Sequence, residues 1–394
     1  MLMAFAAAEA GARWLAPRET GIDPARIDAR SYFTEEEIER GKKFARPQFM
    51  LGMARAAVET GALALLVRRP PRALRRLSER PVVAGAAAGA GLSLALSLPP
   101  LPLAAIGRAR AKRVGLVTQS WGGWGVDLVK ASAIQSGLAA GAGVAAVAAT
   151  RRYPRSWWAP AGAGSVLVGA LFAVLAPVVL DPVFNRFTAL PEGETRSDVL
   201  ELARRAGVTV GEVYSVDASR RTTAANAYVT GLGPTKRVVL FDTLLDRYTR
   251  DEIRLVVAHE LAHVRHRDVP RGVLYVAIVA PFAAFAVQRV SWALSPERGS
   301  AAALPALALA AGLVSAPIGL VGNRLSRAIE RRADAFSLEL AGAPEAFVSF
   351  ERRIAVQNVA DLEPPRWLTA LLATHPPTTE RIGAAVAFAE RSGS

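Results

Sequence analysis

The chain has 394 residues, 52% of them hydrophobic, with a formal net charge of +14 and no cysteine. The lack of cysteine excludes a disulfide framework and a thiolate metal site. The apolar residues are gathered in stretches of about 20, the length at which a helix crosses a hydrocarbon core of about 30 Å, so the composition favours a multi-span membrane protein.

The N-terminal part, residues 1–48, is predicted to be a polar and charged segment that contains a helix around Glu35–Arg46. It opens with the apolar run Met1–Ala8, which is too short to span a bilayer. This run also lacks the basic residues that open a signal peptide. We therefore expect the first span to begin at about residue 49.

Six membrane spans are predicted, at residues 49–67, 82–106, 131–149, 160–180, 272–294 and 302–322. The first four form an N-terminal membrane domain, residues 49–180, and the last two occupy residues 272–323. Two pairs of glycines, Gly85 with Gly89 and Gly137 with Gly141, place small residues one helical turn apart. Such pairs allow helices to approach closely.

Arginine supplies most of the positive charge, and much of it lies between the spans, at residues 68–80 and 107–113. A basic chain is often a nucleic-acid-binding protein. Loops that flank apolar spans are more typical of contact with anionic lipid headgroups. We therefore predict membrane lipids, and no nucleic acid, as partners. The two loops fall on opposite sides of the membrane, so their charge selects no orientation.

Two segments of soluble character remain, residues 181–271 and 324–394. The first is predicted to contain these elements: a helix at Asp198–Arg205, a strand at Val208–Val216, a hairpin of Tyr228–Thr230 with Val238–Phe241 around residues 231–234, and a helix at Asp251–His266. The second begins with a charged helix at 324–342. Because two crossings separate the segments, both lie on the same side of the membrane and can form one α+β catalytic domain.

The predicted helix at Asp251–His266 contains His259-Glu260-Leu261-Ala262-His263, an H-E-x-x-H motif. Residues at i and i+4 share one helix face, so both imidazoles can bind one ion. Zinc suits two imidazoles and a carboxylate and leaves a position for water. Glu260 can then take the proton of that water. The alternative is a solvated helix with idle histidines, but the motif follows the apolar Val256-Val257-Ala258, where unpaired polar groups are costly.

The third zinc ligand is predicted to be Glu330, on the helix that two crossings return to the side of His259. Asp334 lies one turn further on the same face and can accept the free N–H of a zinc-bound imidazole. His266 is a possible extra ligand, but a catalytic site with three protein ligands does not need it. His375, in the turn Thr374–Thr378, is either a turn histidine or a donor to the oxyanion of a tetrahedral intermediate.

These segments together resemble the integral-membrane zinc proteases of the type I CAAX prenyl endopeptidase family and, more distantly, the HtpX heat-shock proteases. The resemblance runs from about residue 30 to the end and rests on the following segments: Phe33-Thr34-Glu35, Phe184–Thr188, Asp217–Arg221, Asn226-Ala227-Tyr228, Gly231-Leu232, Lys236–Leu245, the zinc motif, Ser326–Asp334 and His375-Pro376. It implies a mainly α-helical, multi-span membrane protein with a zincin-like catalytic domain.

The resemblance also implies roles for single residues. The predicted zinc ligands are His259, His263 and Glu330, with one zinc ion per chain. Glu260 is the expected general base and Asp334 supports a ligand. The remaining implied residues lie at the substrate cleft: Asn226 binds the substrate backbone, Arg381 also contacts the substrate, and His375 is catalytic.

The sequence departs from the eukaryotic members of that family, which have seven spans, because only eight apolar residues precede the charged segment. The Ala- and Arg-rich composition is typical of bacteria, in which a prenylated substrate need not exist. The resemblance therefore implies the mechanism but not the identity of the substrate. We expect a zinc metalloendopeptidase of the cell membrane, with its catalytic domain facing the cytoplasm as in the family. Its substrate is either a lipidated, CAAX-like peptide or a damaged membrane protein. A transporter or scaffold with a structural zinc is the rival from another class.

Overall fold

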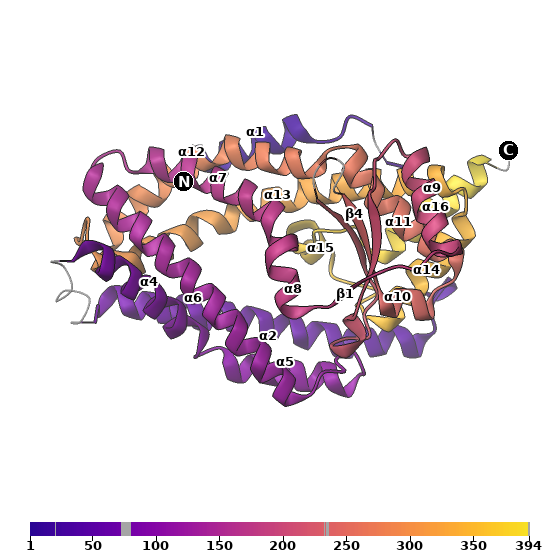
Figure 1. Ribbon diagram of the computed structural model, residues 1–394, viewed down its shortest axis with the longest axis horizontal. Coiled ribbons are helices and arrows are strands. Elements are labelled where there is room, and N and C mark those ends of the chain that lie inside the picture. Colours follow the sequence, from indigo (N-terminus) through magenta and orange to yellow (C-terminus); the bar gives the residue numbers. More distant parts are fainter. Residues whose placement is uncertain (20, 72–79, 232, 234–235, 393–394) are drawn as a thin grey trace.

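The computed structural model describes residues 1–19, 21–71, 80–231, 233 and 236–392. The centre of the predicted arginine-rich loop, residues 72–79, lies outside the described residues, as do Leu232 and Pro234 of the predicted hairpin. The described part is mainly helical, and its one sheet lies at the end of the molecule away from the loops that join most of the long helices (Figure 1).

Eight helices form the apolar half of the described chain: α1 (Leu2–Leu15), α2 (Glu35–Arg68), α4 (Pro81–Ser97), α5 (Leu101–Arg113), α6 (Trp121–Arg152), α7 (Trp158–Leu175), α12 (Asp268–Leu294) and α13 (Leu304–Ala341). Five segments are long and apolar enough to cross a membrane, and a sixth is present if α4 and α5, bent by 49°, form one span. All six predicted spans therefore fall on such helices.

Two of the long helices are more continuous than predicted. We expected a charged helix to end before a span at residue 49, but α2 runs through this point from Glu35 to Arg68 despite Pro47. Likewise α13 continues from the last span to Ala341 and ends where Gly342 adopts the left-handed conformation, with φ 65°. The second catalytic segment is therefore an uninterrupted extension of a membrane helix.

The N-terminal helix α1 packs on α12 and α13 through Ala8, Ala12 and Leu15 (Figure 1). We predicted only a polar and charged segment before residue 49, whereas the structure gives its first helix an apolar, buried face. Fourteen residues extend about 21 Å, which is less than the thickness of a hydrocarbon core.

Of the two predicted glycine pairs, one lies at a close contact between helices and the other does not. A side chain at Gly89 would meet the backbone of Ala139 at 2.0 Å, and one at Gly85 would meet the backbone of Gly143 at 2.8 Å. These two glycines therefore allow α4 to contact α6 backbone to backbone. Gly137 and Gly141, in contrast, face open space in the described structure.

The sheet has four strands in the order β1-β2-β4-β3: β1 (Phe187–Ala189), β2 (Glu212–Val216), β3 (Ala227–Thr230) and β4 (Arg237–Phe241). The predicted hairpin is confirmed, since β3 and β4 pair antiparallel with Tyr228 opposite Val239. The predicted strand at Val208–Val216 is confirmed only from Glu212, and β1 was not predicted. β3 is an edge strand among the described residues.

The remaining helices surround this sheet: α8 (Asp181–Phe184), α9 (Glu194–Arg205), α10 (Asp242–Arg247), α11 (Arg250–Arg265), α14 (Pro344–Gln357), α15 (Arg366–Leu372) and α16 (Thr378–Ser392). Leu202 of α9, Leu240 of β4 and Leu261 of α11 are fully buried in the same core. Helix α11 also packs on α13 and α14. The core thus holds the predicted zinc helix between the sheet and the second catalytic segment.

Asp198 of α9 joins this helix to α11 through charged hydrogen bonds. Arg250 Nη2 donates to Asp198 Oδ1 over 2.8 Å, and Arg254 Nη1 donates to the same atom over 3.0 Å. The hydrogen bond from Arg250 holds the pKa of Asp198 below its usual value, against the effect of burial. The stability that this carboxylate contributes is therefore present above its unfolded-state pKa of about 3.9 and is lost as the pH falls below it.

We predict that Asp198→Asn lowers the thermal midpoint of the detergent-solubilised protein at pH 7 by about 2–4 °C, because one charged hydrogen-bond partner is lost. As the pH falls below about 4 toward the lowered pKa of the folded state, the wild type loses the contribution of this carboxylate, so the difference shrinks there. Glu201→Gln, which removes an exposed carboxylate paired only with Arg204 on the same helix, is the control and leaves the midpoint nearly unchanged. A difference that is independent of pH would contradict the assignment.

Candidate metal centre

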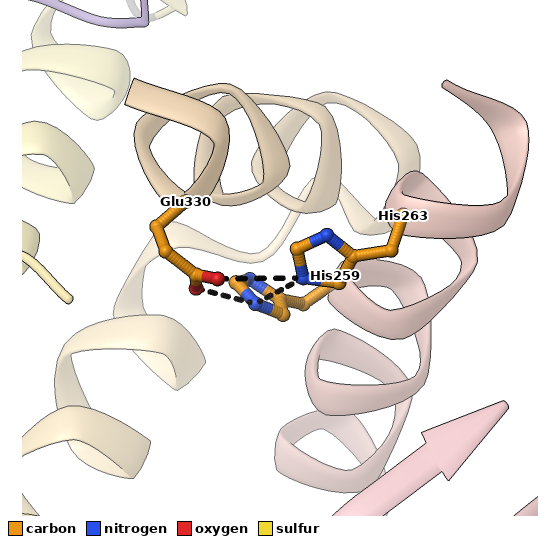
Figure 2. A group of neighbouring side chains, drawn as sticks. All are labelled: His259, His263 and Glu330. Carbon is orange, nitrogen blue, oxygen red and sulfur yellow. Dashed lines mark hydrogen bonds and ion pairs between the residues drawn. The ribbon is translucent and has the colours of Figure 1, made fainter. Parts of the chain in front are cut away.

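Helix α11 places the H-E-x-x-H residues on the inner side of the catalytic half. It begins with a capping box in which Thr249 and Glu252 satisfy each other's backbone N–H groups. Its buried face, which includes Val257 and Leu261, packs into the core. His259 and His263, four residues apart, then project together toward α13 (Figure 2).

Three side chains converge there, as predicted. The Nε2 atoms of His259 and His263 are 3.3 Å apart. Glu330 Oε2 lies 3.3 Å from the first, and Glu330 Oε1 lies 3.7 Å from the second (Figure 2). Zinc bonds of 2.0–2.2 Å in a tetrahedral site imply ligand separations of about 3.3–3.6 Å. The observed separations therefore fit one zinc ion held by these three residues.

Carboxylates lie behind both imidazoles. His259 Nδ1 is 2.9 Å from Asp334 Oδ1, where we predicted a supporting carboxylate. His263 Nδ1 is 3.0 Å from Asp268 Oδ2, which we did not predict. In each ring the carboxylate contacts the nitrogen opposite Nε2, so Nε2 is left to bind the ion.

Asp268 reaches His263 because the chain turns sharply between the two helices. Arg267 has φ 56° and ψ 46°, a left-handed conformation, and Asp268 is the first residue of α12. Such a conformation costs about 1–3 kcal/mol in a residue other than glycine and is found mainly at functional sites. In the sequence, the only sign of this contact is the presence of an acidic residue five positions after the second histidine.

A chain of charged groups extends from His259 into the protein. Arg381 donates two hydrogen bonds to Asp334, of 2.8 and 2.6 Å, and its Nη1 lies 2.6 Å from Glu351 Oε1. Burial raises the pKa of Glu351 to about 7. The substrate contact predicted for Arg381 stays a prediction, because the contacts that the structure describes are with these two carboxylates. Glu351 was not singled out from the sequence.

The electrostatics of the centre favour a cation. Burial alone would lower the pKa of His259, but Asp334 and Glu330 outweigh burial and raise it to about 10. Glu330 Oε2 is buried and accepts no hydrogen bond from the described residues. A buried, unsatisfied carboxylate oxygen beside two imidazoles is the arrangement that a divalent ion completes.

The other predicted residues lie around this group. Burial raises the pKa of Glu260, so its carboxyl is a strong proton acceptor when ionised. His375 Nε2 is 3.6 Å from Glu330 Oε2, and its side chain is 65% exposed. His266 is not one of the converging ligands and instead contacts the ring of Phe336.

Asn226 immediately precedes the edge strand β3, which packs beside α11. Its Oδ1 accepts a hydrogen bond from Ala227 N, and its carbonyl accepts one from Phe241 N. Its side chain is exposed, and the amide nitrogen has no partner within the part of the chain that the structure describes. A donor group is thus available next to an unpaired strand edge.

Comparison with known sequences decides the family, since residues 189–389 match Peptidase family M48. The chain belongs to this family. It is 32% identical over 241 residues to the uncharacterized metalloprotease YhfN of Bacillus subtilis, covering 59% of this chain and 57% of that protein. It is 31% identical over 232 residues to the CAAX prenyl protease 1 homolog of Oryza sativa, covering 55% and 54%. The chain thus spans about half the length of these curated relatives.

A bacterial relative is matched over more of its length. The protein is 31% identical over 207 residues to Protease HtpX of Legionella pneumophila, covering 47% of this chain and 72% of that one. The fold matches the crystal structure of S. mikatae Ste24p with a TM-score of 0.75 over 97% of this chain and 95% of that one, at 20% identity. The predicted fold class, a multi-span α-helical membrane protein with a metalloprotease domain, is confirmed.

We predict that this M48 protein binds one zinc ion per chain, and that Asp268→Asn and Asp334→Asn each weaken binding about 10- to 100-fold. Each change removes the carboxylate that orients one imidazole. Zinc content by mass spectrometry and affinity by competition with a fluorescent chelator provide the test, with no need for a substrate.

The matched control for this experiment is Glu339→Gln, which removes an exposed carboxylate on α13, the helix that carries Asp334. Its zinc affinity should equal that of the wild type. Equal affinities for the control and for Asp268→Asn would refute the role of Asp268.

Proposed function

We propose that this protein is a membrane-embedded zinc metalloendopeptidase. The observation that carries the proposal is the convergence of His259, His263 and Glu330, with Glu260 on the same helix turn. When bound, zinc lowers the pKa of a coordinated water toward about 7 and polarises a carbonyl oxygen. The chain's own residues supply the remaining functions, which are proton transfer, charge stabilisation and substrate alignment.

Glu260 is the proposed general base. It accepts the proton of the attacking water and passes it to the amine that leaves when the peptide C–N bond breaks. Its buried position suits this task, because a carboxylate with a raised pKa holds a proton more readily than a solvated one. Asp334 and Asp268 keep the imidazoles fixed while this proton moves.

His375 is the proposed donor to the oxyanion of the tetrahedral intermediate. It approaches the centre from the loop between α15 and α16 and lies near Glu330. Its exposure leaves the ring free to contact a bound peptide, and its distance of 3.6 Å from Glu330 Oε2 keeps it beside the reacting carbonyl.

The proposed substrate is an extended peptide that adds to the edge of β3. Main-chain hydrogen bonds to an edge strand align a peptide whatever its side chains are. Asn226 stands at the start of this strand with a free amide nitrogen, and the strand packs beside the zinc helix. A peptide on this edge therefore passes the metal centre.

Two substrate classes follow from the resemblance stated above. One is a CAAX-like C-terminal peptide, with or without a lipid, as the names of the eukaryotic relatives suggest. The other is a damaged membrane protein, which requires no fixed motif. We propose the first for this chain, because the relatives so named match the larger share of it. Following the resemblance, we also place the catalytic half in the cytoplasm.

We predict that Glu260→Gln lowers the rate of peptide cleavage about 10²- to 10⁴-fold while zinc stays bound at one per chain, because the amide cannot accept the proton. The substrates are labelled casein and a farnesylated CAAX peptide, cut by purified protein with and without phenanthroline. A transporter or scaffold with a structural zinc predicts instead that this variant retains full function, and that outcome would overturn the proposal.

The two cleft residues should affect different kinetic constants. His375→Ala is expected to lower kcat about 10²- to 10³-fold, because an oxyanion donor acts only in the transition state. Asn226→Ala should raise KM about 2- to 12-fold with little change in kcat, as expected for one lost neutral hydrogen bond to bound peptide. Steady-state kinetics on a single peptide distinguishes them, and a reversed pattern would exchange the two roles.

A further inference from the structure

A second site lies at the end of the membrane helices opposite the metal centre. It is a cavity of about 650 Å³ between the α6–α7 connection and the α12–α13 connection. Its walls include Arg151 and Arg155 on one side and Trp292 and Arg298 on the other. The catalytic mechanism uses none of these residues.

The position of the cavity relative to a bilayer follows from the spans. Helix α6 ends at Arg152 and α7 begins at Trp158, while α12 ends at Leu294 and α13 begins at Leu304. All four segments qualify as membrane spans, and the cavity lies where they end. It therefore occupies the headgroup region of the leaflet opposite the catalytic half (Figure 1).

Three arginines of the cavity wall lack a carboxylate partner. No side-chain ion pair of Arg151, Arg155 or Arg298 is present within the described ranges. By contrast, the arginines around the metal centre pair with Asp334, Glu351 and Asp268. One acidic residue, Glu297, also lines the cavity and has its own interaction. With three arginines and one acidic residue in its wall, the opening carries an excess of positive charge.

The rest of the wall suits the region of a phospholipid between its phosphate and its acyl chains. The guanidinium of Arg298 lies 4.8 Å from the ring centre of Trp292, a cation–π contact that fixes its position. Trp157 is buried and also lines the cavity, and tryptophan is typical of the membrane–water boundary. Ala306 and Leu307 extend the wall along α13 toward the apolar part of the span. Ser300 Oγ, also at the cavity, has no hydrogen-bond partner among the residues that the structure describes.

We propose that this cavity binds the phosphate of an anionic phospholipid headgroup. The three arginines supply the charge, and the apolar wall below them accommodates the start of the acyl chains. The tight loop at Gly299, whose φ is 64°, lies against Arg151, so the two connections meet there. A lipid bound here bridges the α6–α7 and α12–α13 pairs, so it stabilises the membrane half without entering the catalytic site.

The test uses the full-length chain in detergent and native mass spectrometry with added phosphatidylglycerol, phosphatidylcholine or inorganic phosphate. The wild type should retain one phosphatidylglycerol at concentrations where phosphatidylcholine is lost. Arg151→Gln combined with Arg298→Gln should weaken this binding about 25-fold, since each basic residue near a membrane surface contributes about five-fold.

The matched control is Arg68→Gln combined with Arg69→Gln, which removes the same charge at the same membrane end but outside the cavity. Its affinity for phosphatidylglycerol should stay within two-fold of the wild type. Equal losses in both double variants would overturn the proposal, as would equal retention of the two lipids. Displacement of phosphatidylglycerol by millimolar inorganic phosphate would also overturn it, because the site would then bind a soluble anion. Unchanged zinc content in both variants verifies that the fold is intact.

Discussion

The contact between α11 and α13 is the constraint on which the rest of the structure depends. Two imidazoles at i and i+4 offer two ligands, and a catalytic zinc site needs a third from elsewhere. Glu330 is in place to supply it only because α13 returns from the membrane to lie against α11 (Figure 1). The two membrane crossings between these helices are thus part of the metal centre's architecture.

This contact buries several charges, and the way in which they are paired explains why the fold tolerates them. Breaking a buried ion pair is costly because it leaves an uncompensated charge. Asp334 therefore faces both His259 and Arg381, and Arg381 in turn faces Glu351. The series ties α11, α13, α14 and α16 together. Glu351 is thus connected to His259 through Arg381 and Asp334.

Helix α13 also connects the two ends of the molecule. Its 38 residues extend about 57 Å, further than a hydrocarbon core is thick. Leu307 lies in the wall of the arginine-lined cavity near its start, and Glu330 lies in the metal centre beyond the span. The same helix therefore carries the proposed third metal ligand and forms part of the proposed lipid site.

The sequence by itself determined the features that depend on local spacing. The interval between His259 and His263 specifies a shared helix face, and stretches of about 20 apolar residues specify the spans. Counting crossings placed Glu330 on the side of His259. His375 was singled out from its turn and then favoured by the resemblance, whereas Asn226 and Arg381 came from the resemblance alone. The proposed roles of all three remain predictions.

Only the tertiary structure decided which charged residues complete the centre. Asp268 faces His263 because Arg267 adopts a left-handed turn, and no local pattern specifies that conformation in an arginine. Glu351 reaches Arg381 because α14 and α16 pack together, which depends on side chains distant in the sequence. Charged residues on a helix resemble a solvated surface until the fold buries them, and burial is a property of the packed chain.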